Sequence, residues 1–370
     1  MEFIIDKDEF AKGLYRAQSV VERKGTMPIL MNVLIEASEG NVSITATDLE
    51  ITVRGKHPAN IKKEGKATVS AKKLYEVVKE LPDQEVLIRQ KENQWVEVSS
   101  GKSFFNIMGI SAETFPTLPP LQEEEFIHVK ADVIREMIEK TIFSVSNDES
   151  RYNLTGVFLT KKKEVEKEIR MVATDGYRLS LIDRPIESMI GGLEEGILLP
   201  KKGLGELNKL LHEEGGEISI KMEQNNCIVK KDHTVLMMRL LDAEFPDYRQ
   251  VIPQKSRRQV KMSRMDAMDS LRRVSILSSE KTKGVKFHFT KDLLELSSYN
   301  PDIGEAKEEV VIEYKGEDII VGFNAKFILD VLNILNSDQI LFDFEDGVSP
   351  SVIRPEDDLG HTCVVMPMRI

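Results

Sequence analysis

The chain opens with FIIDKDEFAKGLYRAQSVV at residues 3–21, a short strand-like run that leads directly into an amphipathic helix pattern. Two later stretches repeat that order, FIHVKADVIREMIEKTIFSV at 126–145 and QVKMSRMDAMDSLRRVSIL at 259–277. In each stretch apolar residues recur at helical spacing, as Phe10 and Leu14 do in the first. We therefore interpret the chain as one structural unit that is written three times.

Each copy continues with a second helix pattern between two strand patterns. These stretches are VSAKKLYEVVKELPDQEVLIR at 69–89, LPKKGLGELNKLLHEEGGEISIKM at 199–222 and GFNAKFILDVLNILNSDQILFDF at 322–344. A chance likeness among mixed helix and strand segments is the alternative interpretation. The same element order at a nearly constant period argues against it.

Short alternating runs between the helices, such as NVSITATDLEITVRG at 41–55, predict antiparallel strands joined by polar turns. Each unit is therefore predicted to be α+β, with about two helices on one face of an antiparallel sheet. The segments TLPPLQEEE at 117–125 and PQKSRRQ at 253–259 predict the boundaries between units. The resulting domains are residues 1–122, 123–253 and 254–370.

The charge of the chain is unevenly distributed. The 370 residues carry a net charge of -11, which by itself argues against nucleic-acid binding. The predicted helix windows are nevertheless positive in sum; they are 7–24, 72–80, 131–143, 201–212, 264–283 and 325–338. Two such chains would give six units, whose helices can line the hole of a closed ring. The plainer alternative is that basic residues are good solvated helix formers.

Motifs for catalysis, metals or export are lacking in the sequence. Gly101-Lys102-Ser103 lacks the upstream glycine of a phosphate loop, since position 96 is Val96, and it reads as a hairpin turn. The six histidines are scattered, and Cys227 and Cys363 form no metal-binding pattern. The start resembles no signal peptide, and no apolar run approaches membrane-spanning length. We expect a cytoplasmic protein with no cofactor, metal or catalytic residue.

Four stretches carry a family resemblance: ATDGYRLSL at 173–181, AEFPDYRQVIP at 243–253, LSSEKTKGVK at 277–286 and the terminal VVMPMRI at 364–370. They resemble the bacterial DNA polymerase III β subunit, or β sliding clamp, a processivity factor. The resemblance implies a head-to-tail homodimeric ring that encircles double-stranded DNA without reading its sequence. It also implies that the ring tethers the replicative DNA polymerase, is opened by a clamp loader, and catalyses nothing.

The resemblance further implies a hydrophobic pocket, between the second and third domains, for peptide motifs of partner proteins. The residues that match this pocket are Leu154, Thr174, Gly176, Tyr177, Arg178, Leu179, Pro246, Val251, Asn324, Phe327, Val348, Pro350, Val364, Val365, Met366, Pro367, Met368 and Arg369. Flexible methionines at the end of the chain suit a groove that accepts varied apolar anchors. Without the resemblance, the terminal Val and Met residues read as the last strand of a core.

Candidate DNA contacts and candidate ring-closing residues follow from the resemblance and from the predicted helix faces. Candidate DNA contacts by position in the family are Lys24, Arg151, Tyr152 and Asn153, and candidates on the inner helices are Arg16, Arg135, Lys140, Lys202, Lys209 and Arg272. Candidate ring-closing residues are Lys73 and Phe105 of one chain and Ile276 and Leu277 of the other. Phosphate contacts alone suffice for binding that is independent of sequence.

Two other classes of protein remain open from the sequence. One is an enzyme whose repeated units cradle a small ligand, and the missing motifs count against it. The other is an interaction scaffold that forms rings or chains without threading DNA. Such a scaffold would share the pocket but would lack the inner basic surface.

Overall fold

The computed structural model describes residues 1–21, 27–82, 84–116, 126–162, 165, 167–188, 190–212, 215–253 and 257–369. The chain forms two compact units, Met1–Ala131 with Lys202–Leu240, and Asp132–Lys201 with Leu241–Ile370. The segment 123–253 contributes to both units, because its strands join two different sheets. Lys24 and the predicted boundary at 117–125 lie outside the described residues.

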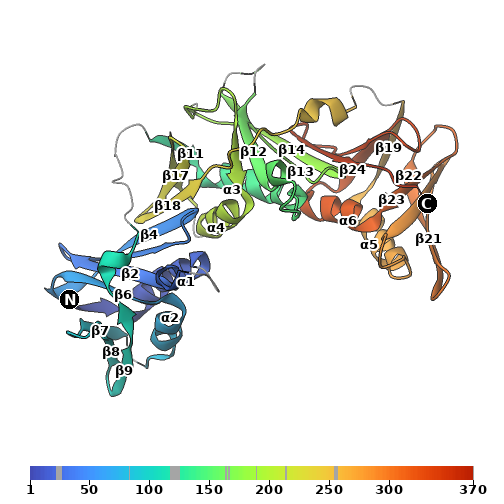
Figure 1. Cartoon of the computed structure of the whole chain (residues 1–370). Helices are drawn as coiled ribbons and strands as arrows, with labels where there is room; N and C mark the ends of the chain where they lie inside the picture. The colour runs from blue at the N-terminus through green and yellow to red at the C-terminus, as the bar shows by residue number, and fades with distance from the viewer. Residues whose placement is uncertain are drawn as a thin grey trace. The chain divides into compact units, whose positions relative to one another are not determined.

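The first unit contains two antiparallel sheets (Figure 1). The larger has the order β10-β6-β2-β3-β4-β18-β17-β16-β11. Its strands are β10 (Gly109–Ile110), β6 (Gly65–Ser70), β2 (Asn32–Ser38), β3 (Asn41–Thr47), β4 (Ile51–Pro58), β18 (Thr234–Arg239), β17 (Asn226–Lys231), β16 (Glu217–Glu223) and β11 (Ile127–Lys130). The smaller sheet consists of β5 (Asn60–Lys63), β1 (Glu2–Asp6), β7 (Glu85–Gln90), β8 (Val96–Ser100) and β9 (Ser103–Ile107). β8 and β9 form the hairpin predicted around Gly101.

A seam between two repeats runs through the larger sheet, where β4 pairs with β18. Val53 of β4 lies opposite Leu236 of β18, and both side chains are buried. The first repeat therefore continues into the second through backbone hydrogen bonds, which are satisfied across the seam as within any sheet.

The helices of the first unit begin where the sequence supplies caps. The Asp6 carboxylate accepts the N–H groups of Asp8 and Glu9 at the start of α1 (Lys7–Val20), and Ser70 caps α2 (Ala71–Glu80). The third helix is α4 (Lys201–Leu211). α1 is shorter than its predicted window, because the backbone is already extended at Val21.

The second unit is built on a twelve-stranded sheet with the order β15-β12-β13-β14-β26-β25-β24-β19-β22-β21-β20-β23. Its strands are β15 (Ile197–Pro200), β12 (Gly156–Lys161), β13 (Glu168–Thr174), β14 (Arg178–Pro185), β26 (His361–Val365), β25 (Ser351–Pro355), β24 (Gln339–Phe344), β19 (Arg258–Ser263), β22 (Gly304–Glu313), β21 (Leu293–Asn300), β20 (Gly284–Thr290) and β23 (Ile319–Asn324). β14 pairs with β26 and places Ser180 opposite Cys363. A second seam between repeats therefore runs through this sheet. It joins β14 to β26, the last strand of the chain.

The helices of the second unit are α3 (Ala131–Glu139), α5 (Arg264–Ser275) and α6 (Ala325–Ile334). All six predicted helices therefore form, and the later ones also end before their predicted windows do. α5 and α6 cover a core rich in phenylalanine, with Phe287, Phe289 and Phe342 packed against one another. Short 3-10 turns complete the elements; they are η1 (Pro28–Met31), η2 (Ala112–Thr114), η3 (Ile142–Ser144), η4 (Tyr152–Leu154) and η5 (Tyr248–Val251).

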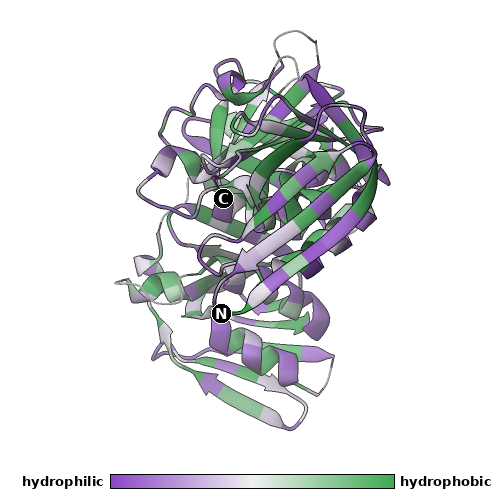
Figure 2. Ribbon diagram, turned by 90° about the vertical axis from the view of Figure 1, so that its right-hand side faces the viewer, coloured by the Kyte–Doolittle hydropathy of each residue, from purple (hydrophilic) through white to green (hydrophobic). Residues whose placement is uncertain are grey.

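The strands alternate hydrophobic and hydrophilic residues along their length, as the banding in Figure 2 shows. In β20, for example, Val285 and Phe287 are buried whereas Lys286 is exposed. This alternation is what the period of a half-buried strand requires. Across the described part of the chain, no helix combines the length and apolar character that crossing a membrane takes.

Candidate functional site

A tight turn between β13 and β14 forms one wall of a pocket in the second unit. The Asp175 carboxylate accepts the N–H groups of Tyr177 and Arg178, both at 3.0 Å. Thr174 Oγ1 accepts the N–H of Gly176 at 3.1 Å, and the φ angle of Gly176 is +87°. The sequence Thr-Asp-Gly supplies this turn locally, because Asp bonds the backbone ahead of it and Gly tolerates positive φ.

Arg178 ties the turn to α6 and to the segment after α3. Its side chain is buried and donates to Asp175 at 3.1 Å and to Asp330 at 2.6 Å. It also donates to the backbone carbonyl of Phe143 at 2.8 Å. Since the guanidinium is satisfied on several sides, we infer that Arg178 holds the turn in place and is not available as a free charge.

An aromatic and cationic stack stands at the rim of the pocket. The ring of Tyr177 is 57% exposed and lies on the ring of Phe327, with the centroids 6.3 Å apart. The Arg151 guanidinium lies 5.8 Å from the Tyr177 ring and donates to the carbonyl of Asp175 at 2.8 Å. Cation–π contacts and this hydrogen bond position the Tyr177 ring without burying it.

The pocket itself has a volume of about 420 Å³. Its predicted lining residues are Leu154, Thr174, Gly176, Tyr177, Arg178, Leu179, Pro246, Val251, Val364 and Met366. Four further residues line it that the sequence did not assign there: Arg151, Asn153, Asp247 and Tyr248. Leu154, Leu179 and Val364 belong to one buried apolar cluster that also includes Tyr248. An apolar floor with a polar rim suits an extended peptide with apolar anchors.

The other predicted pocket residues lie around this cavity or beyond it. Asn324 caps α6, Val348 and Pro350 belong to the loop between β24 and β25, and Val365 is fully buried in the core. Val365 is therefore a core residue, as the last strand of a sheet requires, and it has no exposed surface to offer a ligand.

The C-terminal tail crosses from this pocket to a second hollow. The N–H of Met366 donates to Tyr177 O at 2.9 Å, and the N–H of Met368 donates to Gly322 O at 2.8 Å. Met368 and Arg369 line the second hollow, whose volume is about 850 Å³, and Pro367 lies between the two anchored residues. The tail is thus fixed at alternate residues, which resembles the pairing of an edge strand.

The candidate DNA contacts are distributed over both units. In the first unit Arg16 donates to Thr234 at 2.8 Å, Lys202 pairs with Asp48, and Lys209 pairs with Glu206 at 2.8 Å. In the second unit Arg135 pairs with Asp132, Arg272 contacts Asn333 and Asp269, and Arg151 pairs with Asp148. Tyr152 is half exposed, and Asn153 and Arg151 belong to the pocket lining.

Lys140 does not fit the role predicted for it. Its side chain is buried and pairs with Glu136 at 2.8 Å and with Asp358 at 3.5 Å. Arg184 pairs with the same two carboxylates, and its hydrogen bond is the main reason that the pKa of Glu136 is lowered to about 2. Because Lys140 is neutralised inside this network, it cannot release counterions from DNA as an exposed lysine would.

The candidate ring-closing residues are accessible in the isolated chain. Phe105 lies on β9, an edge strand of the smaller sheet, and Ile276 at the end of α5 is 73% exposed. Leu277 is half-buried beside it, and Lys73 pairs with Glu76 at 2.8 Å on the surface of α2. Contiguous groups of exposed apolar side chains are typical of interaction surfaces, whereas single ones are ordinary.

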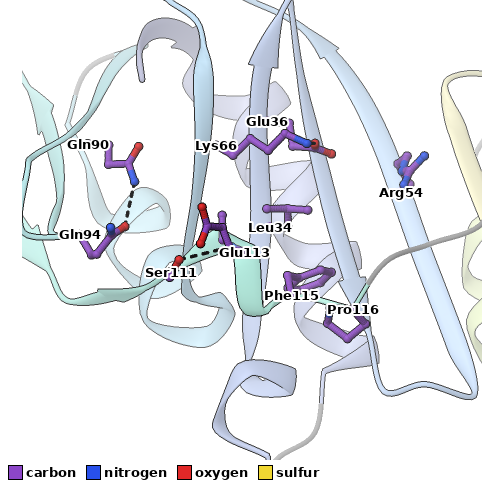
Figure 3. Close-up of a pocket in the computed structure, with 11 residues that line it drawn as sticks. Leu34, Glu36, Arg54, Lys66, Gln90, Gln94, Ser111, Glu113, Phe115 and Pro116 are labelled. Atoms are coloured by element: carbon purple, nitrogen blue, oxygen red, sulfur yellow. Dashed lines mark hydrogen bonds and ion pairs between the residues drawn. The ribbon is translucent and has the colours of Figure 1, made fainter.

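A third hollow lies in the first unit and has a volume of about 650 Å³ (Figure 3). Leu34 and Phe115 form its apolar part, while Lys66 and Glu36 meet across it in an ion pair of 2.5 Å. Its lining carries two basic side chains, Arg54 and Lys66, and two carboxylates, Glu36 and Glu113, so its charges balance in number. No cluster of histidine, cysteine or carboxylate side chains suited to a metal ion occurs within the described residues.

Comparisons with known proteins cover all parts of the chain. The models of the DNA polymerase III beta subunit match its N-terminal domain at residues 1–119, its central domain at 128–247 and its C-terminal domain at 249–369. The beta sliding clamps of Pseudomonas aeruginosa and Chlamydia pneumoniae are 32% and 31% identical to the chain, which is covered in full in both cases.

Solved structures agree with these relatives. A sliding clamp from Bartonella birtlesii, bound to griselimycin, is 34% identical with a TM-score of 0.96, and 100% of each chain is covered. The DNA polymerase III beta subunit of Thermotoga maritima is 33% identical with a TM-score of 0.92, covering 100% of this chain and 99% of that one.

Proposed function

The chain belongs to the family of the DNA polymerase III beta subunit, the beta sliding clamps, and from that premise we propose how it closes into a ring and where its partners dock. It is a DNA sliding clamp of replication, a non-catalytic processivity factor built from three clamp domains. Its partners are DNA and the polymerase. We place the domain boundaries at residues 122 and 253 and the protein in the cytoplasm, where buried unpaired cysteines such as Cys227 and Cys363 are ordinary.

The proposed ring is a head-to-tail homodimer, and the recurring seam between repeats is the observation that carries it. β4 pairs with β18, and β14 pairs with β26, so each repeat offers one strand to the next. By position in the repeat, β22 corresponds to β4 and β14, and β9 corresponds to β18 and β26. A seam between β22 of one chain and β9 of its partner repeats the pattern and closes the circle.

Both strands of this proposed seam have a backbone edge that is largely unpaired among the described residues. β9 has only β8 beside it among the described residues, and β22 meets β19 only near its end, at Ile312 and Glu313. The repeat predicts Phe105 opposite Ala306, with Phe104 opposite Lys307 and Asn106 opposite Glu305. Phe105 would then pack beside Ile276 and Leu277, with Lys73 at the rim of that contact.

We assign the pocket below Tyr177 to peptide motifs of the polymerase, the clamp loader and other partners. Its volume, its apolar floor and the adaptable Met366 support this assignment. Phe327, Asn324, Val348, Pro350, Pro367, Met368 and Arg369 remain candidates for the outer part of the same groove. Lys24, Arg16, Arg135, Arg151, Tyr152, Asn153, Lys202, Lys209 and Arg272 remain candidate phosphate contacts. Lys140 is not among them, because it is buried in ion pairs with Glu136 and Asp358.

Topological linkage to DNA tests the ring. The protein is loaded with a clamp loader and ATP onto nicked circular DNA and then washed in high salt, which screens phosphate contacts. A closed ring stays on the circle and slides off once the circle is cut into a linear molecule. Retention after cutting, or release by salt from the intact circle, rules out encirclement.

Deleting Met366–Ile370 tests the pocket. The deletion removes the methionine that lines the pocket and should abolish binding of an apolar-anchored peptide while the dimer persists, as measured by fluorescence anisotropy and light scattering. The control is Leu359→Ala, which changes a residue that is 83% exposed and lies outside the pocket. Dissociation into monomers would show that the tail belongs to the ring-closing surface instead.

A further inference from the structure

The hollow of about 850 Å³ lies on the outward face of β20, β21 and β22, next to the C-terminal tail. Strand alternation points Val285, Phe287 and Leu296 into the core and leaves the opposite side chains on this face. The residues lining the hollow are Ser279, Thr282, Gly284, Lys286, Ser297, Ser298, Tyr299, Glu305, Ala306, Lys307, Met368 and Arg369. Of these, Glu305, Ala306 and Lys307 also belong to the seam proposed with the partner chain, whereas Lys286 and Arg369 do not.

A cross-strand row of side chains crosses the hollow. Lys286 of β20 lies opposite Ser297 of β21, and Ser297 lies opposite Lys307 of β22. Directly opposed residues of neighbouring strands have Cβ atoms about 5 Å apart, so the two lysines flank the serine at about 10 Å from each other. Tyr299, opposite Glu305, adds an exposed aromatic ring beside this row.

The charge of the hollow is unbalanced. Lys307 pairs with Glu295 at 2.5 Å, whereas neither Lys286 nor Arg369 takes part in an ion pair in the described part of the chain. Glu305 is the sole carboxylate among the described residues that line the hollow. The hollow of Figure 3 differs, because there Lys66 is already matched by Glu36. On a chain with a net charge of -11, an unmatched basic hollow favours an acidic occupant.

The tail connects this hollow with the peptide pocket. Met366 lines the pocket and Met368 lines the hollow, and the N–H groups of both are hydrogen-bonded to the protein. Met368 also lies against Gly284, where a Cβ would be 3.6 Å from its terminal carbon. A bound chain that follows the tail for a few residues therefore passes from apolar to basic surroundings.

We propose that this hollow is a second subsite, which takes an acidic segment flanking the apolar anchor of a partner's docking peptide. The proposal rests on the peptide pocket proposed above and names a further feature of its ligands. Lys286 and Arg369 attract the carboxylates, and Ser297 and Tyr299 offer hydroxyl groups to them.

Labelled synthetic peptides test the subsite with the full-length protein. All share one leucine–phenylalanine anchor and carry no extension, four glutamates or four glutamines, placed at either end of the anchor. In about 50 mM salt, glutamate should bind on the order of five-fold more tightly than glutamine at one end, since a pair of exposed charges contributes modestly. About 0.5 M salt should remove this gain.

Charge reversal at Lys286 locates the effect. Lys286→Glu should abolish the glutamate gain and leave the affinity for the unextended peptide unchanged. Lys291→Glu, an equal change at the exposed β20–β21 turn and outside the hollow, should leave the gain intact.

Two results would overturn the subsite. Equal affinities of the glutamate and glutamine peptides at both ends would do so, and so would a gain that persists in Lys286→Glu. Failure of the unextended peptide to bind the unaltered protein would instead overturn the peptide pocket itself, and the subsite with it.

Discussion

Single residues near the β14–β26 seam combine burial with charge. Arg178 satisfies two carboxylates and a backbone carbonyl, and the Lys140 network neutralises another cation close to the same strands. His361 lies on β26 with Nε2 3.3 Å from Ser180 Oγ, while Nδ1 is buried without a hydrogen-bond partner among the described residues. The seam therefore depends on buried charged side chains that are paired within the protein.

Arg178→Ala should lower the free energy of unfolding of the second unit by about 3 kcal/mol, because Asp175 and Asp330 lose their common cation. Urea unfolding followed by circular dichroism measures the change. Arg249→Ala serves as the control, since its pair with Asp247 is exposed, and it should cost about 0.5 kcal/mol or less. Equal effects of the two substitutions would contradict the role given to Arg178.

His361 should make stability depend on pH. Burial, followed by the charge of Lys140, lowers its pKa to about 3, well below the ordinary value of 6.5. The fold therefore favours neutral imidazole, so its contribution is complete above about pH 6.5 and is lost as the pH falls toward about 3. Tm measured between pH 6.5 and 4.5 should fall, and His361→Gln should flatten this slope. The exposed His128→Gln should leave the slope unchanged.

At the scale of elements, helices pack on the sheets where small residues allow close approach. Gly13 lies in the middle of α1, and a Cβ there would be 2.4 Å from His57 Nε2 and 2.7 Å from Ile44 Cδ1. Gly205 lies in the middle of α4, and among the described residues no atom outside its own helix lies within 4 Å of such a Cβ. Both glycines lie in the middle of a helix. Gly13 allows α1 to pack closely on the sheet, whereas Gly205 meets no such contact.

Gly13→Ala should lower the stability of the first unit by about 2 kcal/mol, because the added methyl group overpacks the contact between α1 and the sheet. Gly205→Ala should raise stability by about 0.5 kcal/mol, since alanine is the better helix former. Fluorescence of Trp95, the single tryptophan, follows unfolding of this unit. A stabilising Gly13→Ala would show that α1 has room that the structure does not indicate.

At the scale of the whole molecule, the same type of antiparallel strand pairing joins neighbouring repeats at both internal seams. β4 with β18 and β14 with β26 place equivalent residues opposite each other, as Val53 with Leu236 and Ser180 with Cys363. The proposed ring extends that relation to a second chain. Its edges also differ in charge, because β22 carries Glu305, Glu308 and Glu309 whereas Lys91 and Lys102 flank β8 and β9.

Asn106→Cys in one chain should form a disulfide with Glu305→Cys in its partner, because the proposed register places these exposed positions opposite each other. A mixture of the two single variants is oxidised and analysed by non-reducing electrophoresis. The off-register pair Asn106→Cys with Glu309→Cys should stay largely unlinked, and the native cysteines are buried. Equal linking of both pairs would contradict this register.

The sequence alone determined the local features of this protein. Periodicity predicted all six helices and alternation predicted the strands, because each pattern depends on residues that are neighbours along the chain. Ten of the residues that the resemblance assigns to the peptide pocket line one pocket in the structure. Helix ends were less well predicted, since Val21 leaves the helical conformation although the sequence pattern continues.

Only the tertiary structure decided which side chains are buried and which distant residues meet. Lys140 looks like any basic residue on a helix until Glu136 and Asp358 enclose it, and Arg151 and Tyr248 join the pocket from separate segments. The row of Lys286, Ser297 and Lys307 likewise exists only through strand register. Burial and cross-strand proximity depend on residues far apart in the chain, so no local pattern encodes them.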